Sequence, residues 1–171
     1  MRLNIGCGKR TDPDWWNCDV QQDPDASQPL DAICDARSIP LPDECADVVQ
    51  AIHLFEHLYR WEIDSALAEW RRLLKPKGTL ILELPNLVKC CQNYLSGRVR
   101  GGKEPDQLSR WGIYGDPRTG NHWMNHRWGY SPAELIDILH ARGFVKAKEH
   151  ATQFHPAGRE YRDMRIEARK A

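Results

Sequence analysis

Short apolar runs separated by polar stretches recur along the chain, and their length is that of buried β-strands. Each run is bounded by glycine, proline or charged residues, which commonly end strands. Seven runs fit this description: residues 3–5, 15–20, 31–36, 46–52, 79–84, 144–149 and 161–168. The pattern therefore predicts strands distributed over the whole chain.

Apolar residues three or four positions apart predict helices between some of these strands. In the clearest case Ile63, Leu67 and Trp70 fall on one helical face. Ser131, with Glu134 three residues later, is typical of the first turn of another helix. The predicted helices cover residues 61–74, 87–95 and 131–142.

Strands that alternate with helices are typical of α/β proteins. We therefore expect a Rossmann-like, doubly wound, mostly parallel sheet between helical layers, in a three-layer α-β-α arrangement. Residues 9–14 are too few for a helix, so the first crossover is minimal, and no N-terminal cap helix precedes the first strand. Because no linker or repeat is visible, we expect one domain over residues 1–171, with an aperiodic insertion at about 97–130.

The charge of the chain excludes some classes of partner. Lys and Arg number 24, Asp and Glu also number 24, and the pI is near 7.0. A neutral chain is not typical of a dedicated nucleic-acid binder or of a protein that docks on anionic membranes. The mean hydropathy is −0.66, and the six cysteines contain no CxxC pair. We expect a cytoplasmic protein with free thiols and no membrane segment.

The most informative stretch is the first strand with the turn that follows it. Gly6-Cys7-Gly8 allows a ligand to approach the main chain closely. Asp19 ends the second predicted strand and Asp35 ends the third. The carboxyl ends of parallel strands meet at one edge of a sheet, where such folds bind nucleosides. We therefore expect these residues to form one nucleoside site.

Histidines occur in two patterns that suggest metal binding. Residues 53–57 read HLFEH, the pattern of inverted zinc proteases, but that motif needs a continuous helix and here it follows a buried strand directly. His122 and His126 are four residues apart, and together with His53 they could bind zinc or iron. We interpret them instead as loop histidines, with His57 in a structural role, and assign no metal.

Motifs in the expected order give the chain a family resemblance. They are LNIGCG at 3–8, WxNxD at 15–19, DA at 35–36, IPLP at 39–42, FEHL at 55–58, LKPKG at 74–78 and PN at 85–86. Together they resemble the class I S-adenosylmethionine-dependent methyltransferases, and above all the small bacterial branch called methyltransferase type 11. WGYS at 128–131 and ARGF at 141–144 fit the same branch. The resemblance implies a seven-stranded sheet whose last strand is antiparallel.

The resemblance also implies that S-adenosylmethionine is the cofactor. The glycine turn would face its methionine part, Asp19 its ribose hydroxyls and Asp35 its adenine. The implied cofactor-binding residues are Asn4, Gly6, Cys7, Gly8, Asp19, Val20, Asp35, Ala36, Ile52 and His53. Lys9 and Arg10 stand where the fuller family pattern has a third glycine, and the cap helix is missing, so we allow for a homodimer that completes the site.

The expected reaction is methyl transfer to a hydroxyl or amine of a small molecule or sugar. A histidine suits the removal of the acceptor proton near neutral pH. The candidate catalytic residues are His53, by its position after the fourth strand, and His122 or His126, which lie in the insertion. We expect the acceptor pocket between residues 84–86 and 110–130. Tryptophans and arginines in this loop could line a sugar site, stack on bases or only anchor the loop.

Three alternatives remain open. A nicotinamide oxidoreductase shares the first glycine turn but needs the third glycine that this chain lacks. An S-adenosylmethionine-binding protein without transferase activity would fit the short first crossover. A nucleic-acid methyltransferase fits less well, because the charge is neutral and neither NPPY nor DPPY occurs.

Overall fold

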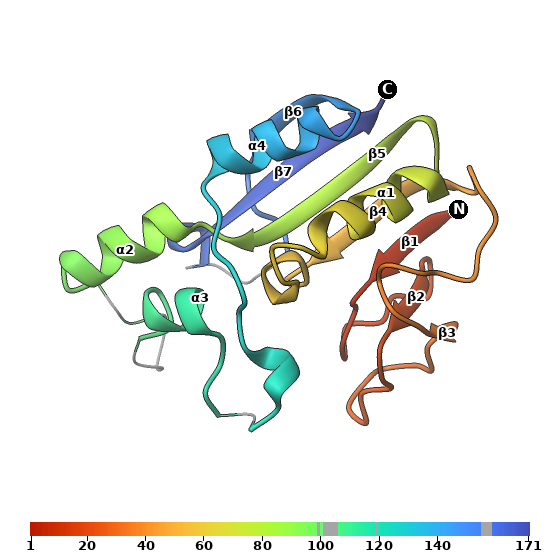
Figure 1. Cartoon of the computed structure of the whole chain (residues 1–171). Helices are drawn as coiled ribbons and strands as arrows, with labels where there is room; N and C mark the ends of the chain where they lie inside the picture. Colours follow the sequence, from red (N-terminus) through yellow and green to blue (C-terminus); the bar gives the residue numbers. More distant parts are fainter. Residues whose placement is uncertain (99, 101–105, 119, 155–158) are drawn as a thin grey trace.

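The protein is described by a computed structural model that covers residues 1–98, 100, 106–118, 120–154 and 159–171. All seven predicted strands are present in one sheet of order β3-β2-β1-β4-β5-β7-β6 (Figure 1). The strands are β1 Arg2–Ile5, β2 Trp16–Asp19, β3 Ala32–Ile33, β4 Ala46–Ile52, β5 Leu74–Pro85, β6 Phe144–His150 and β7 Asp163–Lys170. β7 is antiparallel to β5 and β6, and the strands from β3 to β5 pair in parallel. The expected antiparallel last strand is thus confirmed.

Of the described α-helices, α1, α2 and α4 begin and end close to the predicted positions, whereas the short α3 lies in the insertion and was not predicted. They are α1 Ile63–Leu73, α2 Leu87–Leu95, α3 Arg110–Tyr114 and α4 Pro132–Ala141, with 3-10 turns η1 Phe55–His57, η2 His122–Met124 and η3 Arg159–Tyr161. Ser131 caps α4 by accepting a hydrogen bond of 3.2 Å from the Glu134 amide. The Asn86 side chain caps α2, which fixes the direction in which the chain leaves β5.

One face of the sheet is apolar and carries the core. Leu3, Val49, Leu80 and Ala168 are register neighbours across β1, β4, β5 and β7, and each is at most 2% exposed. α1 and α4 lie over this face (Figure 1). The indole of Trp70, on α1, is fully buried and donates to the Ala36 carbonyl at 2.9 Å. This core fixes the positions of the strand ends that form the site.

The opposite face is polar where the sequence predicted a second helical layer. Asn17, Asn4 and Gln50 are register neighbours on this face and hydrogen-bond in a row at 3.0 and 3.1 Å. No helix of the described residues packs there, so the three-layer arrangement is not formed. Right-handed crossovers from β1 to β2 and from β2 to β3 would have placed helices on this face. Both connections are too short or too rich in proline to form them.

Two further segments differ from the simplest expectation. The KPKG stretch at 75–78 does not separate α1 from β5 as a turn but forms a β-bulge within β5. Ala46 pairs with Leu74, whereas Val48 pairs with Thr79. The predicted insertion contains α3 and η2, and its residues 99, 101–105 and 119 lie outside the described residues. None of the described helices is long and apolar enough to cross a bilayer.

Candidate active site at the carboxyl edge of the sheet

The glycine turn after β1 has the conformation that only glycine adopts easily. Gly6 and Gly8 have φ angles of 66° and 53°. A Cβ at Gly6 would come within 2.7 Å of the Leu54 side chain, whereas a Cβ at Gly8 would meet nothing within 4 Å. The turn is held to β2 by hydrogen bonds from the Gly6 and Cys7 amides to the Cys18 carbonyl. The main chain at Gly8 is therefore open to a ligand.

Asp19 lies directly against this turn. Its Oδ2 atom accepts a hydrogen bond of 2.8 Å from the Gly8 amide, and its Oδ1 atom accepts one of 2.7 Å from the Val20 amide. Each carboxylate oxygen retains a second lone pair, so the group can still accept bonds from a ligand. The two features that the sequence analysis placed in one site are thus in contact.

Asp35 lies at the neighbouring strand end. The Cys34 amide donates to the Asp19 carbonyl at 2.9 Å, which aligns the two acids along one edge. The Arg37 guanidinium donates two hydrogen bonds, of 2.8 and 2.6 Å, to the Asp35 carboxylate and lowers the pKa of this carboxyl. Asp35 is therefore an ionised acceptor held in a fixed orientation by Arg37, which also pairs with Glu62.

His53 follows β4 in a left-handed conformation, with φ of 52°. Its Nδ1 atom lies 2.9 Å from Glu56 Oε1, and its Nε2 atom lies 3.4 Å from Asp163 Oδ2. Burial alone would lower the pKa of His53, but hydrogen bonds to Asp163 and Glu56 outweigh burial and raise the pKa to about 9. His53 is therefore an imidazolium between two carboxylates at neutral pH. A base must be neutral, so this geometry does not favour the expected role of His53 as proton acceptor.

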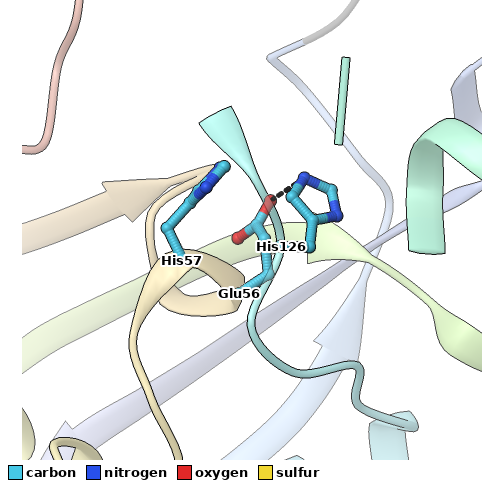
Figure 2. A group of neighbouring side chains, drawn as sticks. All are labelled: Glu56, His57 and His126. Carbon is cyan, nitrogen blue, oxygen red and sulfur yellow. Dashed lines mark ion pairs between the residues drawn. The ribbon is translucent and has the colours of Figure 1, made fainter. Parts of the chain in front are cut away.

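Beside His53, a group of side chains from distant segments comes together. Glu56, His57 and His126 lie close to one another (Figure 2), and the His57 and His126 imidazoles are in edge contact, with ring centres 4.7 Å apart. His126 reaches this group because the Arg127 amide donates to the Glu56 carbonyl at 2.7 Å. Burial lowers the pKa of His126 to about 4, so its ring is neutral.

The other predicted site residues are mostly buried beside the strand ends or bonded to other protein groups. The Asn4 side chain donates to the Asn17 side chain and to the Arg10 carbonyl, so it holds the loop that follows the glycine turn against the sheet. The Cys7 thiol is buried, which raises its pKa to about 12. Ala36 and Ile52 are buried beside the site, Val20 is exposed, and His122 is exposed on η2.

A segment after β6 crosses the same edge. The Gln153 and Phe154 amides each donate at 3.0 Å to the buried carboxylate of Glu83, at the end of β5. The Phe154 carbonyl accepts a bond of 3.0 Å from Arg10, whose guanidinium lies 4.9 Å from the Phe154 ring centre. This segment therefore links β5 to the residues that follow the glycine turn.

Sequence reasoning missed several residues of the site. Glu56 was visible as part of the HLFEH pattern and of the FEHL motif, but neither reveals that its carboxylate is buried. Asp163, at the start of β7, carried no signal because its partner His53 is far away in the sequence. Glu83 reads as an ordinary strand residue until the structure shows what it binds.

Comparisons with known proteins agree with this topology. Residues 3–82 match the methyltransferase domain family. No curated protein sequence matches the chain. The fold is similar to that of a SAM-dependent methyltransferase from Archaeoglobus fulgidus, with 18% identity, a TM-score of 0.66, and 98% of this chain and 85% of that chain covered.

Two other solved structures show the same fold. One is 1,6-didemethyltoxoflavin-N1-methyltransferase from Burkholderia thailandensis, with bound 1,6-didemethyltoxoflavin and S-adenosylhomocysteine (16% identity, TM-score 0.63, 99% of this chain and 70% of that chain covered). The other is a SAM-dependent methyltransferase from Methanosarcina mazei (17% identity, TM-score 0.61, 98% and 91% covered).

Proposed function

We propose that this chain, which its motifs, its sheet and its matched residues 3–82 identify as a class I S-adenosylmethionine-dependent methyltransferase, methylates a hydroxyl or amine of a small molecule or sugar. The observation that carries the cofactor site is the bond between the Gly8 amide and Asp19. It joins the open glycine turn and the ribose-binding acid at one point of the carboxyl edge, where ligands bind in such sheets.

The cofactor lies along this edge in the proposal. Asp19 accepts the ribose hydroxyls, and Asp35, held by Arg37, faces the adenine. The methionine part runs over the glycine turn toward the end of β4. The segment that joins Phe154 to Arg10 supports this placement, because it would cover the cofactor from the side opposite the acceptor.

The chemistry asks little of the protein beyond alignment. The positively charged sulfur of S-adenosylmethionine is a good leaving group, so the main task is to hold the acceptor atom in line with the methyl group. Such positioning contributes up to several kcal/mol. Charge is dispersed in the transition state, so the exclusion of water also helps.

The three candidate histidines are not equally suited to contact the methyl acceptor. His53 is held protonated between Glu56 and Asp163, and we assign it the positioning of these two carboxylates. His122 is exposed on η2. His126 is neutral and presents its Nε2 lone pair beside Glu56, so we assign it the contact with the acceptor. The insertion at about 97–130 supplies this residue and forms the acceptor side of the single domain.

Binding and turnover together test the proposal. Isothermal titration of the whole chain should show binding of S-adenosylmethionine and S-adenosylhomocysteine but not of NAD. Transfer of tritiated methyl groups to small molecules of a cell extract should then be measured. His126→Gln should bind the cofactor normally and lose roughly 100-fold or more of the transfer rate. His140→Gln, on the distant α4, is the matched control and should be fully active.

Each alternative predicts a different result. Cofactor binding with no transfer to any extract component would indicate a binding protein without transferase activity. Binding of NAD in place of S-adenosylmethionine would refute the methyltransferase assignment. Label recovered in RNA or DNA, with binding that weakens steeply as salt is raised, would indicate a nucleic-acid acceptor.

A further inference from the structure

The Glu56 carboxylate contains a buried oxygen atom without a donor. Oε1 is bonded to His53, but Oε2 has no hydrogen-bond partner among the described residues, although the side chain is only 2% exposed. Leaving a charged oxygen in this condition costs free energy, so a native protein normally supplies a donor or a cation. The groups nearest to this carboxylate should therefore show whether it needs a hydrogen-bond donor or a cation.

The two neighbouring imidazoles do not act as donors toward Glu56. His57 Nδ1 lies 3.2 Å from the Asn125 carbonyl, and His126 Nδ1 lies 3.0 Å from the Gly112 carbonyl. A carbonyl only accepts, so both Nδ1 atoms carry the hydrogen. In the neutral form of an imidazole with this tautomer, the Nε2 atom bears a lone pair. His126 Nε2 is 3.9 Å from Glu56 Oε1, so two electron-rich atoms face each other with no hydrogen between them.

We propose that Glu56, His57 and His126 bind one divalent transition-metal ion. One ligand atom from each residue lies within 4.8 Å of the others (Figure 2). Two imidazoles and one carboxylate are a donor set that zinc and iron(II) accept, with positions left open for other ligands. The bonds from both Nδ1 atoms to backbone carbonyls are those that orient metal-binding histidines.

The separations require only a small adjustment. Ligand atoms at about 2.1 Å from a tetrahedral or octahedral ion lie about 3.0 to 3.5 Å apart. His57 is on the short turn η1 and His126 is in a loop, so rotation of their side chains can close the remaining distance. Glu56 is already fixed by His53. The ion would therefore be held between the end of β4 and the insertion.

This inference goes beyond the proposed function, because it concerns ion binding and not methyl transfer. It also changes the role of His126. Metal binding and proton acceptance use the same Nε2 lone pair, so the two roles exclude each other at any moment. Cofactor binding, at Gly8 and Asp19, is independent of both.

The test is direct measurement of metal binding to the whole chain, purified without a histidine tag and stripped with a chelator. Titration with Zn²⁺ should show one saturable site per chain with micromolar affinity or better, and Mg²⁺ should not bind. Co²⁺ should give the visible absorption of nitrogen and oxygen ligands without a thiolate charge-transfer band. His57→Gln, His126→Gln and Glu56→Gln should each weaken Zn²⁺ binding by roughly tenfold or more.

His122→Gln and His140→Gln are the matched controls and should leave Zn²⁺ binding unchanged. S-adenosylmethionine titration of the same samples separates failure of this inference from failure of the proposed function. His57 is partly exposed, so its substitution should not prevent folding, and circular dichroism checks this. No saturable Zn²⁺ site, unaltered binding in His57→Gln and His126→Gln, or a thiolate spectrum would each overturn the proposal.

Discussion

At the level of single residues, the lone pairs that remain available decide what the carboxyl edge can bind. Asp19 spends one lone pair of each oxygen on the amides of Gly8 and Val20 and keeps the others. His53 keeps none, because its two nitrogens face Glu56 and Asp163. The sequence suggested both residues for the site, but only the contacts show that their chemistry differs.

Asp19→Asn should weaken the binding of S-adenosylmethionine. The amide keeps the shape of the side chain but replaces one acceptor oxygen by a donor, which faces a backbone amide donor and can no longer accept from a ribose hydroxyl. We expect a loss of roughly 1.5 to 3 kcal/mol, which is about tenfold or more in Kd, measured by isothermal titration. Asp14→Asn, in the exposed first crossover, is the control. An unchanged Kd would contradict the role of Asp19.

His53 should make stability depend on pH on the alkaline side. Its pKa is raised from 6.5 to about 9 in the folded chain, so its contribution is fully present below pH 6.5 and is lost as the pH rises through about 9. We expect this contribution to be of the order of 1 to 3 kcal/mol. Thermal unfolding of metal-free protein between pH 6 and 10 measures it.

His53→Gln is the matched variant for that profile. It should be less stable than the wild type at pH 7, because Glu56 and Asp163 lose their shared cation. The difference should shrink above pH 9, where the wild-type imidazole is also neutral. A difference that stays constant across this range would indicate that His53 is not protonated in the folded protein.

At the level of elements, loops replace helices as the covers of the site. The first crossover and residues 151–154 after β6 contain no helix, yet Arg10, Phe154 and Glu83 link them across the carboxyl edge. These contacts therefore cover this part of the edge. A loop tied at two points can enclose a ligand and still open.

Arg10→Ala should loosen this cover. The Phe154 carbonyl would lose its donor and the ring would lose its cation, which together contribute roughly 1 to 2 kcal/mol. Hydrogen exchange of the Gln153 and Phe154 amides should become faster, and the Kd for S-adenosylmethionine should rise several-fold. Lys9→Ala is the neighbouring control. Unchanged exchange would show that Arg10 does not hold the segment.

At the level of the whole molecule, the sheet has two unlike faces. α1 and α4 cover the apolar face (Figure 1), whereas the other face carries the row formed by Asn17, Asn4 and Gln50. Asn4 lies at the centre of this row, between Asn17 and Gln50, and its side chain also donates to the Arg10 carbonyl. The row therefore links the sheet to the loop that follows the glycine turn.

Asn4→Ala should destabilise the fold and not only the loop. It removes the donor to the Asn17 side chain and to the Arg10 carbonyl, and the acceptor of the Gln50 amide, at an expected cost of about 1 to 3 kcal/mol in the free energy of unfolding. Urea unfolding monitored by fluorescence measures the loss. Gln92→Ala, exposed on α2, should change it by less than about 0.5 kcal/mol. Equal stability of both variants would mean that water reaches the polar row.

Local patterns were sufficient to predict much of this protein. Apolar runs of strand length, helical spacing and the Ser131 cap depend on neighbours in the chain, so the seven strands, three of the helices and their order could be predicted, but not α3. Only the third strand was much shorter than predicted, with two residues, Ala32 and Ile33. The glycine turn and Asp19 were also predictable, because the ends of adjacent parallel strands must meet at one edge.

Only the tertiary structure decided which residues far apart in the sequence come into contact. The second helical layer was expected from the alternation of elements, but two crossovers are too short to form it. The protonation of His53 depends on Asp163, which lies more than a hundred residues away, and the meeting of Glu56 and His57 with His126 depends on how the insertion folds back. Charge, burial and coordination arise from neighbours in space, and a linear pattern does not record them.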